Sequence, residues 1–245
     1  MPTEPERDIA CLLVHGLNGS PYDFDDVAAQ LGALGYPTQQ LLLPGHDVLA
    51  RIAVRYGWND WTAAIHESFN ALAQRHRRVV VIGHSMGGTL GLHVAACDDR
   101  VAGIAALCAP VALHAGLRPI VRMGKAVLPF LPILREDIRD PAERSAYRRH
   151  KVTHWVSLAP MHTLLAALPM LRAELPNVRC PALIMGARND HVVPLRDAHY
   201  IFDTIASHEK QLYILDRSYH VVTRDVERHL VLAHLTTFLR HLSLT

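Results

Sequence analysis

Short runs of almost purely apolar residues recur along the chain, separated by longer stretches in which apolar and polar residues mix. The runs read IACLLV, QLLL, VVVI, VAGIAAL, ALIM and LYIL, at residues 9–14, 40–43, 79–82, 101–107, 182–185 and 212–215. A strand with one face in water would alternate apolar and polar residues, whereas continuous apolar runs are typical of parallel strands buried on both faces. The pattern therefore predicts a parallel sheet.

Two of the stretches between or after these runs have helical periodicity. In residues 58–74 apolar side chains recur three or four positions apart, at Trp58, Trp61, Ile65, Phe69 and Leu72. In the last stretch we expect a helix with Asp225 as its N-cap and with apolar residues at Val226, Leu230, Phe238 and Leu242. Alternating strands and helices predict an α/β fold with a mostly parallel, doubly wound sheet and helices on both faces.

Residues from about 114 to 160 interrupt this alternation. They contain no strand-like run, and their helix-like pieces are broken by Pro119, Pro129 and Pro132 before the basic stretch YRRHKVTHW. We expect a single domain over residues 1–245, with a helical cap inserted at about 114–160. The alternative is extra helical packing on the same core.

Composition narrows the classes of partner. Half of the 245 residues are apolar, and the formal net charge is +2. The apolar content predicts a sizeable core. A nucleic-acid partner would need a concentrated basic face, and the nearly neutral charge gives no support for one, so we expect no nucleic-acid partner. The acidic start MPTEPERD is unlike a secretory signal, and no apolar run is long enough to cross a bilayer. We therefore expect a cytoplasmic protein without stable membrane insertion.

The cysteine and histidine positions do not predict a metal site. Cys11, Cys97, Cys108 and Cys180 form no CxxC pair, so we interpret them as structural thiols rather than as redox or metal-binding groups. Among the 17 histidines, His150 and His154 are four residues apart, but no third ligand accompanies them.

A candidate nucleophile lies in GHSMG, at residues 83–87, between the strand-like run VVVI and the helix-like run GGTLGLHVAAC. A G-x-S-x-G sequence in a strand–turn–helix setting is typical of a nucleophile on a sharp turn. Gly83 and Gly87 leave room for the strained backbone, and Ser85 is presented beside the start of a helix. The alternative is a glycine-rich turn in which the serine is incidental.

A serine nucleophile needs a base and a carboxylate that orients the base. In this class of site the order along the chain is Ser, then Asp or Glu, then His. Asp190 follows the run ALIM and His220 follows LYIL, so both are expected at the same edge of the sheet as Ser85. Asp216 and His191 are competing candidates, but they fit the spacing less well.

The oxyanion of the tetrahedral intermediate needs two aligned N–H groups. One is expected from Met86, which follows the candidate nucleophile. The other is expected from Leu17, in the loop VHGLNGSP after the first strand-like run.

The chain resembles the α/β-hydrolases, and more narrowly the small bacterial carboxylesterases and monoacylglycerol lipases with a compact cap. The resemblance rests on HGLNGSP, LLLPGHD, WNDW, GHSMGG, CPALIMGARNDHVVP and SYHVVTRD. It implies the α/β-hydrolase fold, with Ser85 as nucleophile, His220 as base and acid, Asp190 as the orienting acid, and Leu17 and Met86 as oxyanion donors. It also implies that no metal or organic cofactor is used.

The resemblance implies a small-molecule ester as substrate, either a short- to medium-chain acyl ester or a monoacylglycerol. Hydrolysis would pass through an acyl-enzyme on the Ser–His–Asp triad. The alternatives are a thioesterase or other acyl hydrolase with the same triad, and a ligand-binding protein of low turnover. The oligomeric state is left open.

Two positions depart from the family pattern. Asp47 stands in LLLPGHD where relatives usually have glycine, and Arg144, next to Glu143, stands where monoacylglycerol lipases carry a glutamate that helps to hold the glycerol end. Apolar cap residues are candidates for an acyl pocket or, equally, for packing against the core: Leu117, Val121, Val127, Leu128, Phe130, Leu131 and Ile133.

Overall fold

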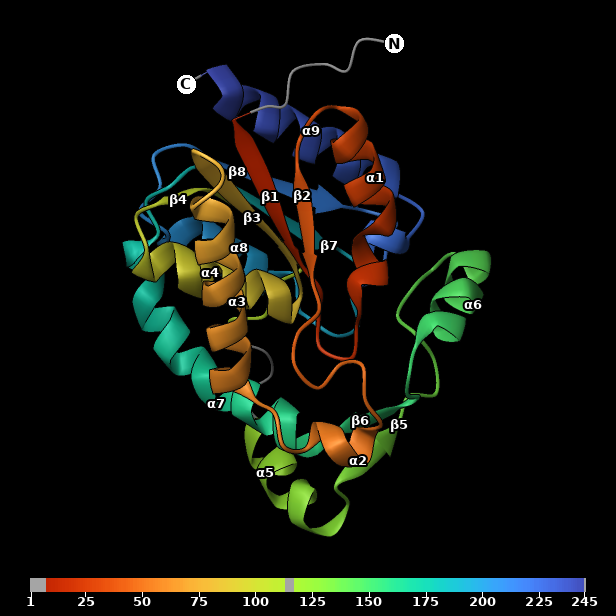
Figure 1. Cartoon of the computed structure of the whole chain (residues 1–245). Coiled ribbons are helices and arrows are strands. Elements are labelled where there is room, and N and C mark those ends of the chain that lie inside the picture. Colours follow the sequence, from red (N-terminus) through yellow and green to blue (C-terminus); the bar gives the residue numbers. More distant parts are fainter. Residues whose placement is uncertain (1–7, 113–116, 245) are drawn as a thin grey trace.

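The computed structural model describes residues 8–112 and 117–244, which are built around a six-stranded sheet (Figure 1). The strand order is β2-β1-β3-β4-β7-β8, and every neighbouring pair is parallel. The strands are β1 (Ile9–Val14), β2 (Thr38–Leu41), β3 (Arg78–His84), β4 (Val101–Leu107), β7 (Ala182–Ala187) and β8 (Lys210–Leu215). The predicted parallel sheet is confirmed, with β2 beginning two residues before the predicted run.

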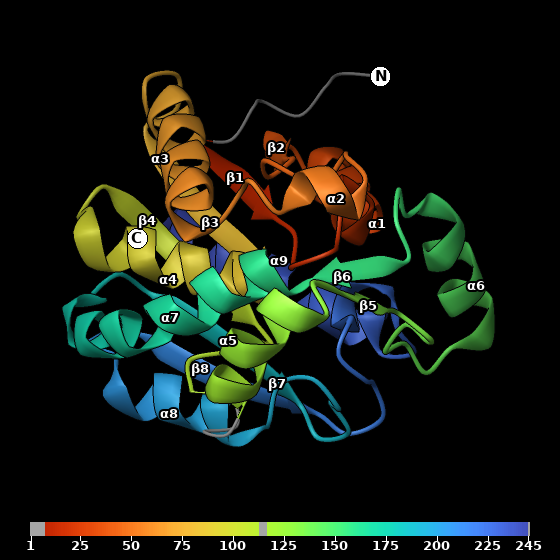
Figure 2. The ribbon, with the colours of Figure 1, turned by 90° about the horizontal axis from the view of Figure 1, so that it is seen from below.

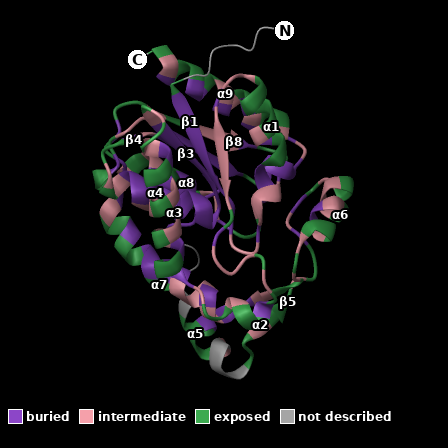
Figure 3. Cartoon of the chain, in the orientation of Figure 1, coloured by how far each residue is buried: buried purple, intermediate pink, exposed green. Residues whose placement is uncertain are grey.

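Helices cover both faces of this sheet. Alternate residues of β1 belong to opposite cores, with Leu12 and Val14 in one and Ile9 and Leu13 in the other. The first core is covered by α3 (Trp58–Ala73), α4 (Met86–Cys97), α7 (Leu158–Glu174) and α8 (Arg196–Thr204), and the second by α1 (Asp25–Ala33) and α9 (Arg228–Leu244). Because both faces are covered, the central strands are buried throughout (Figure 3), which explains their continuous apolar runs.

The two predicted helices are present, but the N-cap predicted for the second one, Asp225, is wrong. All five periodic apolar residues of α3 are buried, as the pattern indicates. Helix α9 begins only at Arg228. The carboxylate of Asp225 accepts backbone N–H groups of Arg139, Asp140 and Tyr219 instead of capping the helix. Asp225 thus ties the segment before α6 to the core, a role that depends on residues distant in sequence.

A group of elements within the predicted cap segment lies beyond the carboxyl edge of the sheet, at the bottom and right of Figure 1, and Figure 2 views this group from below. It contains α5 (Leu117–Val127), β5 (Phe130–Pro132), α6 (Pro141–His150) and β6 (Trp155–Ser157), next to the short α2 (Ala50–Ala53). Residues 114–116 of the predicted cap lie outside the described residues. The expectation that the cap has no strand is wrong, because β5 and β6 pair antiparallel. Strands of three residues are too short to show a period.

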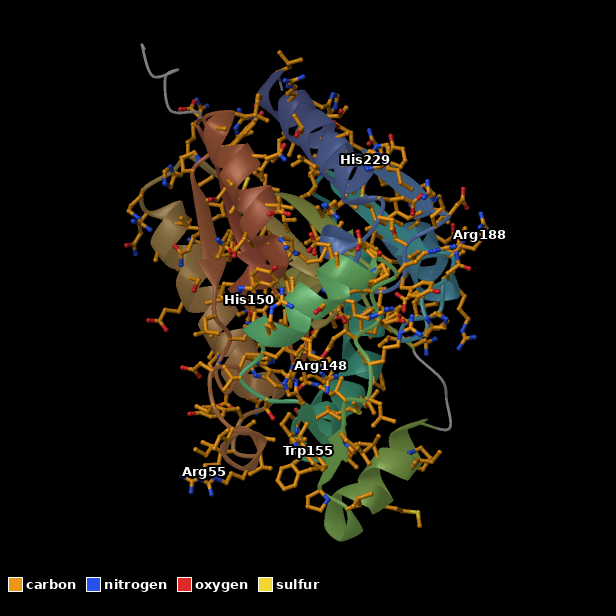
Figure 4. The ribbon with its side chains drawn as sticks, turned by 90° about the vertical axis from the view of Figure 1, so that its right-hand side faces the viewer. Arg55, Arg148, His150, Trp155, Arg188 and His229 are labelled. Atoms are coloured by element: carbon orange, nitrogen blue, oxygen red, sulfur yellow. The ribbon has the colours of Figure 1, made fainter. Side chains whose placement is uncertain are left out.

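Helix α6 contacts the core through ion pairs with Arg224 and Arg228 and through ring stacking. Arg224 lies 2.8 Å from Glu143 of α6 and 3.0 Å from Asp26 of α1, and its guanidinium lies 4.2 Å from the centre of the Tyr22 ring. His150, labelled in Figure 4, stacks on the same ring at 3.8 Å between ring centres.

The described part of the chain also forms short 3-10 helices at Pro21–Phe24, Leu175–Asn177 and Val222–Arg224. Within the described residues, no helix has the length and apolar character needed to cross a membrane.

Candidate active site

Ser85 sits on a sharp turn between β3 and α4. Its φ of 53° and ψ of −122° are unusual for a residue with a side chain, and such a conformation costs about 1–3 kcal/mol. A Cβ at Gly83 would overlap the carbonyl oxygen of Gly87, and a Cβ at Gly87 would overlap the carbonyl oxygen of Val14. The predicted steric reason for both glycines is therefore confirmed. The strained turn is held by backbone packing that admits no larger residue.

The turn places Ser85 next to the predicted base. Nε2 of His220 lies 2.9 Å from Oγ of Ser85, and Nδ1 of His220 lies 2.7 Å from Oδ2 of Asp190. Oδ1 of Asp190 accepts the N–H groups of Val192 and Val193 at 2.7 and 2.8 Å, which fixes the carboxylate. The structure thus brings together three side chains that follow β3, β7 and β8 and are 135 residues apart at the extremes.

The environment keeps Asp190 ionised. Burial alone would raise the pKa of Asp190, but the charge and hydrogen bond of His220, together with the Val192 and Val193 N–H groups, lower it below its usual value. The buried thiol of Cys108 packs against this carboxylate, and burial and the charge of Asp190 raise the pKa of Cys108 well above its usual value. A negative Asp190 holds the His220 ring with Nδ1 toward it and Nε2 toward Ser85.

The competing candidates lie elsewhere. Asp216 is exposed and pairs with Arg188 at 2.7 Å. His191 is also exposed, and its Nδ1 lies 2.7 Å from Asp137. The structure therefore brings neither residue to Ser85.

Asp137 is a residue that the sequence analysis missed. Its Oδ2 accepts the backbone N–H of His220 at 3.2 Å and that of His191 at 3.1 Å. A cap carboxylate thereby supports the loop that carries His220. Asp137 is 83 positions from His220, so no motif or regular spacing in the sequence connects the two residues.

The two expected oxyanion donors flank Ser85. Met86 is the first residue of α4, and an N–H at that position has no intrahelical acceptor. Leu17 lines the same cavity as Ser85. The Leu17 loop is held by His15, whose Nδ1–H donates to the Gly16 carbonyl at 2.9 Å while Nε2 accepts the Leu43 N–H at 3.1 Å.

A largely buried polar network of Asp23, His84 and Tyr147 lines the same cavity as Ser85 and was also missed. Tyr147 of α6 donates its O–H to Oδ1 of Asp23 at 2.9 Å, and Oδ2 of Asp23 lies 3.7 Å from Nδ1 of His84. The other ring nitrogen of His84 donates to the backbone carbonyl of His220 at 2.9 Å. Burial opposes the charge of Asp23, but contacts with His84 and the neighbouring His15 and Tyr147 lower its pKa. In the sequence, the position of His84 within GHSMG was the only feature that pointed to this network.

Above Ser85 is a cavity of about 270 Å³. Much of its lining is apolar, supplied by the predicted cap segment, by α7 and by the loops that carry Asp190 and His220: Ile133, Val156, Met161, Leu164, Leu165, Val192, Val193 and Val221. Of the cap residues considered for an acyl pocket, Ile133 lines this cavity. The side chains of Leu117 and Val127 lie outside the described part of the chain.

The same cavity has a charged part. Nζ of Lys151 lies 2.5 Å from Oε2 of Glu136, and both side chains are largely buried. The other oxygen, Oε1, has no hydrogen-bond partner among the described residues. Neither Glu143 nor Arg144 lines the cavity, and neither does Asp47. Among the acids of the predicted cap segment, Glu136 and Asp137 line the cavity, whereas Glu143, beside the position suggested by the sequence, does not.

Comparisons with known proteins identify the family of this chain. The pattern of a family described as "Serine aminopeptidase, S33" matches residues 5–227. A thermostable monoacylglycerol lipase of Bacillus sp. (strain H-257) is 34% identical, over 95% of this chain and 91% of its own length. A carboxylesterase of Bacillus subtilis (strain 168) is 27% identical, over 96% and 94%.

Solved structures extend the likeness to the fold. A structure from a study of two metagenome-derived lipolytic enzymes has a TM-score of 0.89 and 29% identity, covering 96% of this chain and 95% of its own. A monoacylglycerol lipase of Paleococcus ferrophilus has a TM-score of 0.80 at 17% identity, covering 96% of each chain.

Proposed function

This chain belongs to the serine aminopeptidase S33 family and has the α/β-hydrolase fold, and from that premise we propose that it is a serine esterase with Ser85 as its nucleophile. Its relatives include a monoacylglycerol lipase and a carboxylesterase, so an ester hydrolase of that type is the activity they support. The observation that carries the proposal is the continuous contact from Ser85 through His220 to Asp190 beneath a cavity.

The first half of the reaction forms an acyl-enzyme. His220 takes the proton of Ser85 as Oγ attacks the ester carbonyl, and the N–H groups of Leu17 and Met86 stabilise the oxyanion. Each such donor contributes about 2.7–4 kcal/mol to the transition state in hydrolases generally. The C–O bond then breaks, and the leaving alcohol takes the proton from His220.

The second half releases the acid. A water molecule gives its proton to His220 and attacks the acyl carbon, and Ser85 leaves with the proton returned by the imidazolium. The ionised Asp190 stabilises the imidazolium in both halves. No part of this sequence of steps needs an external oxidant, reductant or metal.

The lining of the cavity supports an amphiphilic ester as substrate. Apolar side chains such as Met161 and Leu164 suit an acyl chain, whereas the Glu136–Lys151 pair suits an alcohol that carries hydroxyl groups. We therefore propose a monoacylglycerol or a similar ester of a polyhydroxylated alcohol. In this proposal the cap at about 114–160 is an insertion within one domain and supplies a wall of the site.

The proposed activity is tested with a panel of p-nitrophenyl esters, monoacylglycerols and acyl-CoA thioesters. Purified protein should hydrolyse p-nitrophenyl butyrate and medium-chain monoacylglycerols with a higher kcat/KM than acyl-CoA. A reversed order would identify a thioesterase. Tight binding of these esters without turnover would identify a ligand-binding protein and contradict the proposal.

The role of Glu136 is tested by the substitution Glu136→Gln. A hydrogen bond to a charged group contributes about 1.5–3 kcal/mol, so kcat/KM for monoacylglycerols should fall about tenfold or more. The value for p-nitrophenyl butyrate should change little, because its leaving group has no alcohol hydroxyls. The matched control is Glu209→Gln, an exposed partner of His241. Equal losses for both substrates would show that Glu136 does not select the alcohol.

A further inference from the structure

A second cluster of chemically reactive side chains lies at the far end of α4 from Ser85. It consists of His93 and Cys97 on α4, Glu174 at the end of α7, and His66 on the neighbouring α3. Along the helix, His93 and Cys97 lie roughly 12 and 18 Å from the nucleophile, at about 1.5 Å per residue. The cluster therefore has no part in the ester chemistry proposed above.

The three principal side chains converge on one point. Nδ1 of His93 lies 2.7 Å from Oε2 of Glu174 and 3.9 Å from Sγ of Cys97. All three donor atoms lie within 4.8 Å of one another. His93 and Cys97 share a helix face because they are four residues apart. The ring of His66 meets the His93 ring edge-on, at 5.7 Å between ring centres.

We propose that His93, Cys97 and Glu174 bind a zinc ion, with His66 or a water molecule as the fourth ligand. Zinc is held in proteins by just these nitrogen, sulfur and oxygen donors, usually in a tetrahedron. Zn–N bonds of about 2.0–2.1 Å and Zn–S bonds of about 2.3 Å place donors about 3.3–3.6 Å apart. Small side-chain rotations bring the present spacings into that range.

Binding changes one proton and no oxidation state. Zinc is bound by neutral imidazole, by carboxylate and by thiolate, so the Cys97 thiol releases its proton to solvent when its sulfur coordinates. Burial and the charges of Glu174 and Asp98 raise the pKa of Cys97, which disfavours a free thiolate nucleophile there. Bound zinc would stabilise the thiolate that the two carboxylates disfavour.

The cluster is partly buried, with Cys97 exposed at its edge. The side chains of His93 and Glu174 are 14% and 21% exposed, and Trp58 packs edge-on against His93. By contrast, His241 and Glu209 form an ion pair in which both side chains are more than half exposed.

The proposed zinc would join two helices that matter to the active site. The turn that carries Ser85 leads into α4, and α7 supplies Met161, Leu164 and Leu165 to the substrate cavity. A metal that bridges the far ends of these helices would stabilise the native state by mass action, because the separated ligands of the unfolded chain bind zinc weakly. It would leave the chemical steps at Ser85 unchanged.

The site is tested by metal titration of protein freed of metal with a chelator. Zinc alone is titrated by calorimetry and cobalt(II) alone by absorbance, and the melting temperature is measured with and without zinc. We expect one zinc per chain, a rise in melting temperature, and a thiolate-to-cobalt charge-transfer band. Cys97→Ser should remove that band, and both Cys97→Ser and His93→Ala should weaken zinc binding at least about tenfold.

Three control variants separate this site from other histidines and thiols. Cys180→Ser and His241→Ala should bind zinc as the wild type does. His220→Ala should also bind normally, which distinguishes the cluster from Cys108, Asp190 and His220, whose donor atoms also lie within 4.8 Å of one another. Unchanged zinc affinity in both Cys97→Ser and His93→Ala, absence of the cobalt band, or loss of binding in His220→Ala would overturn the proposal.

Discussion

Ser85→Ala should lower kcat for p-nitrophenyl butyrate by on the order of 10⁶-fold, the loss that follows removal of a triad nucleophile in a serine hydrolase. The variant has no oxygen that can form the acyl-enzyme, although His220 and the oxyanion donors remain. Because alanine fits the same turn, substrate binding and the melting temperature should be close to those of the wild type. Steady-state kinetics with a calorimetric melt give both quantities.

Ser145→Ala is the matched control for this experiment. Ser145 is exposed on α6 and accepts a hydrogen bond from Arg149 outside the cavity, so activity should be unchanged. If the folded Ser85→Ala variant hydrolysed the ester at the wild-type rate, Ser85 would not be the nucleophile. Loss of the p-nitrophenol burst in the Ser85→Ala variant, measured at high enzyme concentration, would support the acyl-enzyme.

Asp190→Asn should lower kcat by about 10⁴-fold while KM changes little. The amide has a donor as well as an acceptor, so it no longer selects the tautomer in which Nε2 of His220 faces Ser85 without a proton. It also leaves the imidazolium without its negative partner. Steady-state kinetics on p-nitrophenyl butyrate measure both constants. Asp216→Asn, at the exposed competing acid, should keep near-normal activity.

The same carboxylate makes stability depend on pH. The pKa of Asp190 is lower in the folded chain than in the unfolded chain, so its ionised form stabilises the fold above the unfolded pKa. That contribution is lost as pH falls through the folded pKa. The difference in free energy of unfolding between wild type and Asp190→Asn should therefore shrink in acid. A difference that is constant from neutral to acid pH would contradict the assigned shift.

Much of the frame of this protein could be predicted because its signals are local. Buried parallel strands require continuous apolar runs, and five of the six runs lie within or nearly match the strands observed. The turn at Ser85 requires glycine at Gly83 and Gly87, because any Cβ there would overlap backbone. Asp190 and His220 were expected at the edge that carries Ser85 because each follows an apolar strand-like run.

Features that depend on distant pairing could not be predicted in this way. β5 and β6 are three residues each, and Phe130 pairs with Ser157 across the whole of α6. The sequence predicts Asp225 as a helix N-cap, but its carboxylate accepts the backbone N–H groups of Arg139 and Asp140. No period or spacing records such contacts.

What the sequence by itself determined is therefore the sheet, the strained turn and the identity of the residues at its edge, since each follows from the neighbours of a residue along the chain. Only the tertiary structure decided that Glu136, not Glu143, faces the cavity, and that His93 and Cys97 meet Glu174. The physical reason is that side chains from separate elements converge only after those elements have packed, and packing depends on the shapes of both partners.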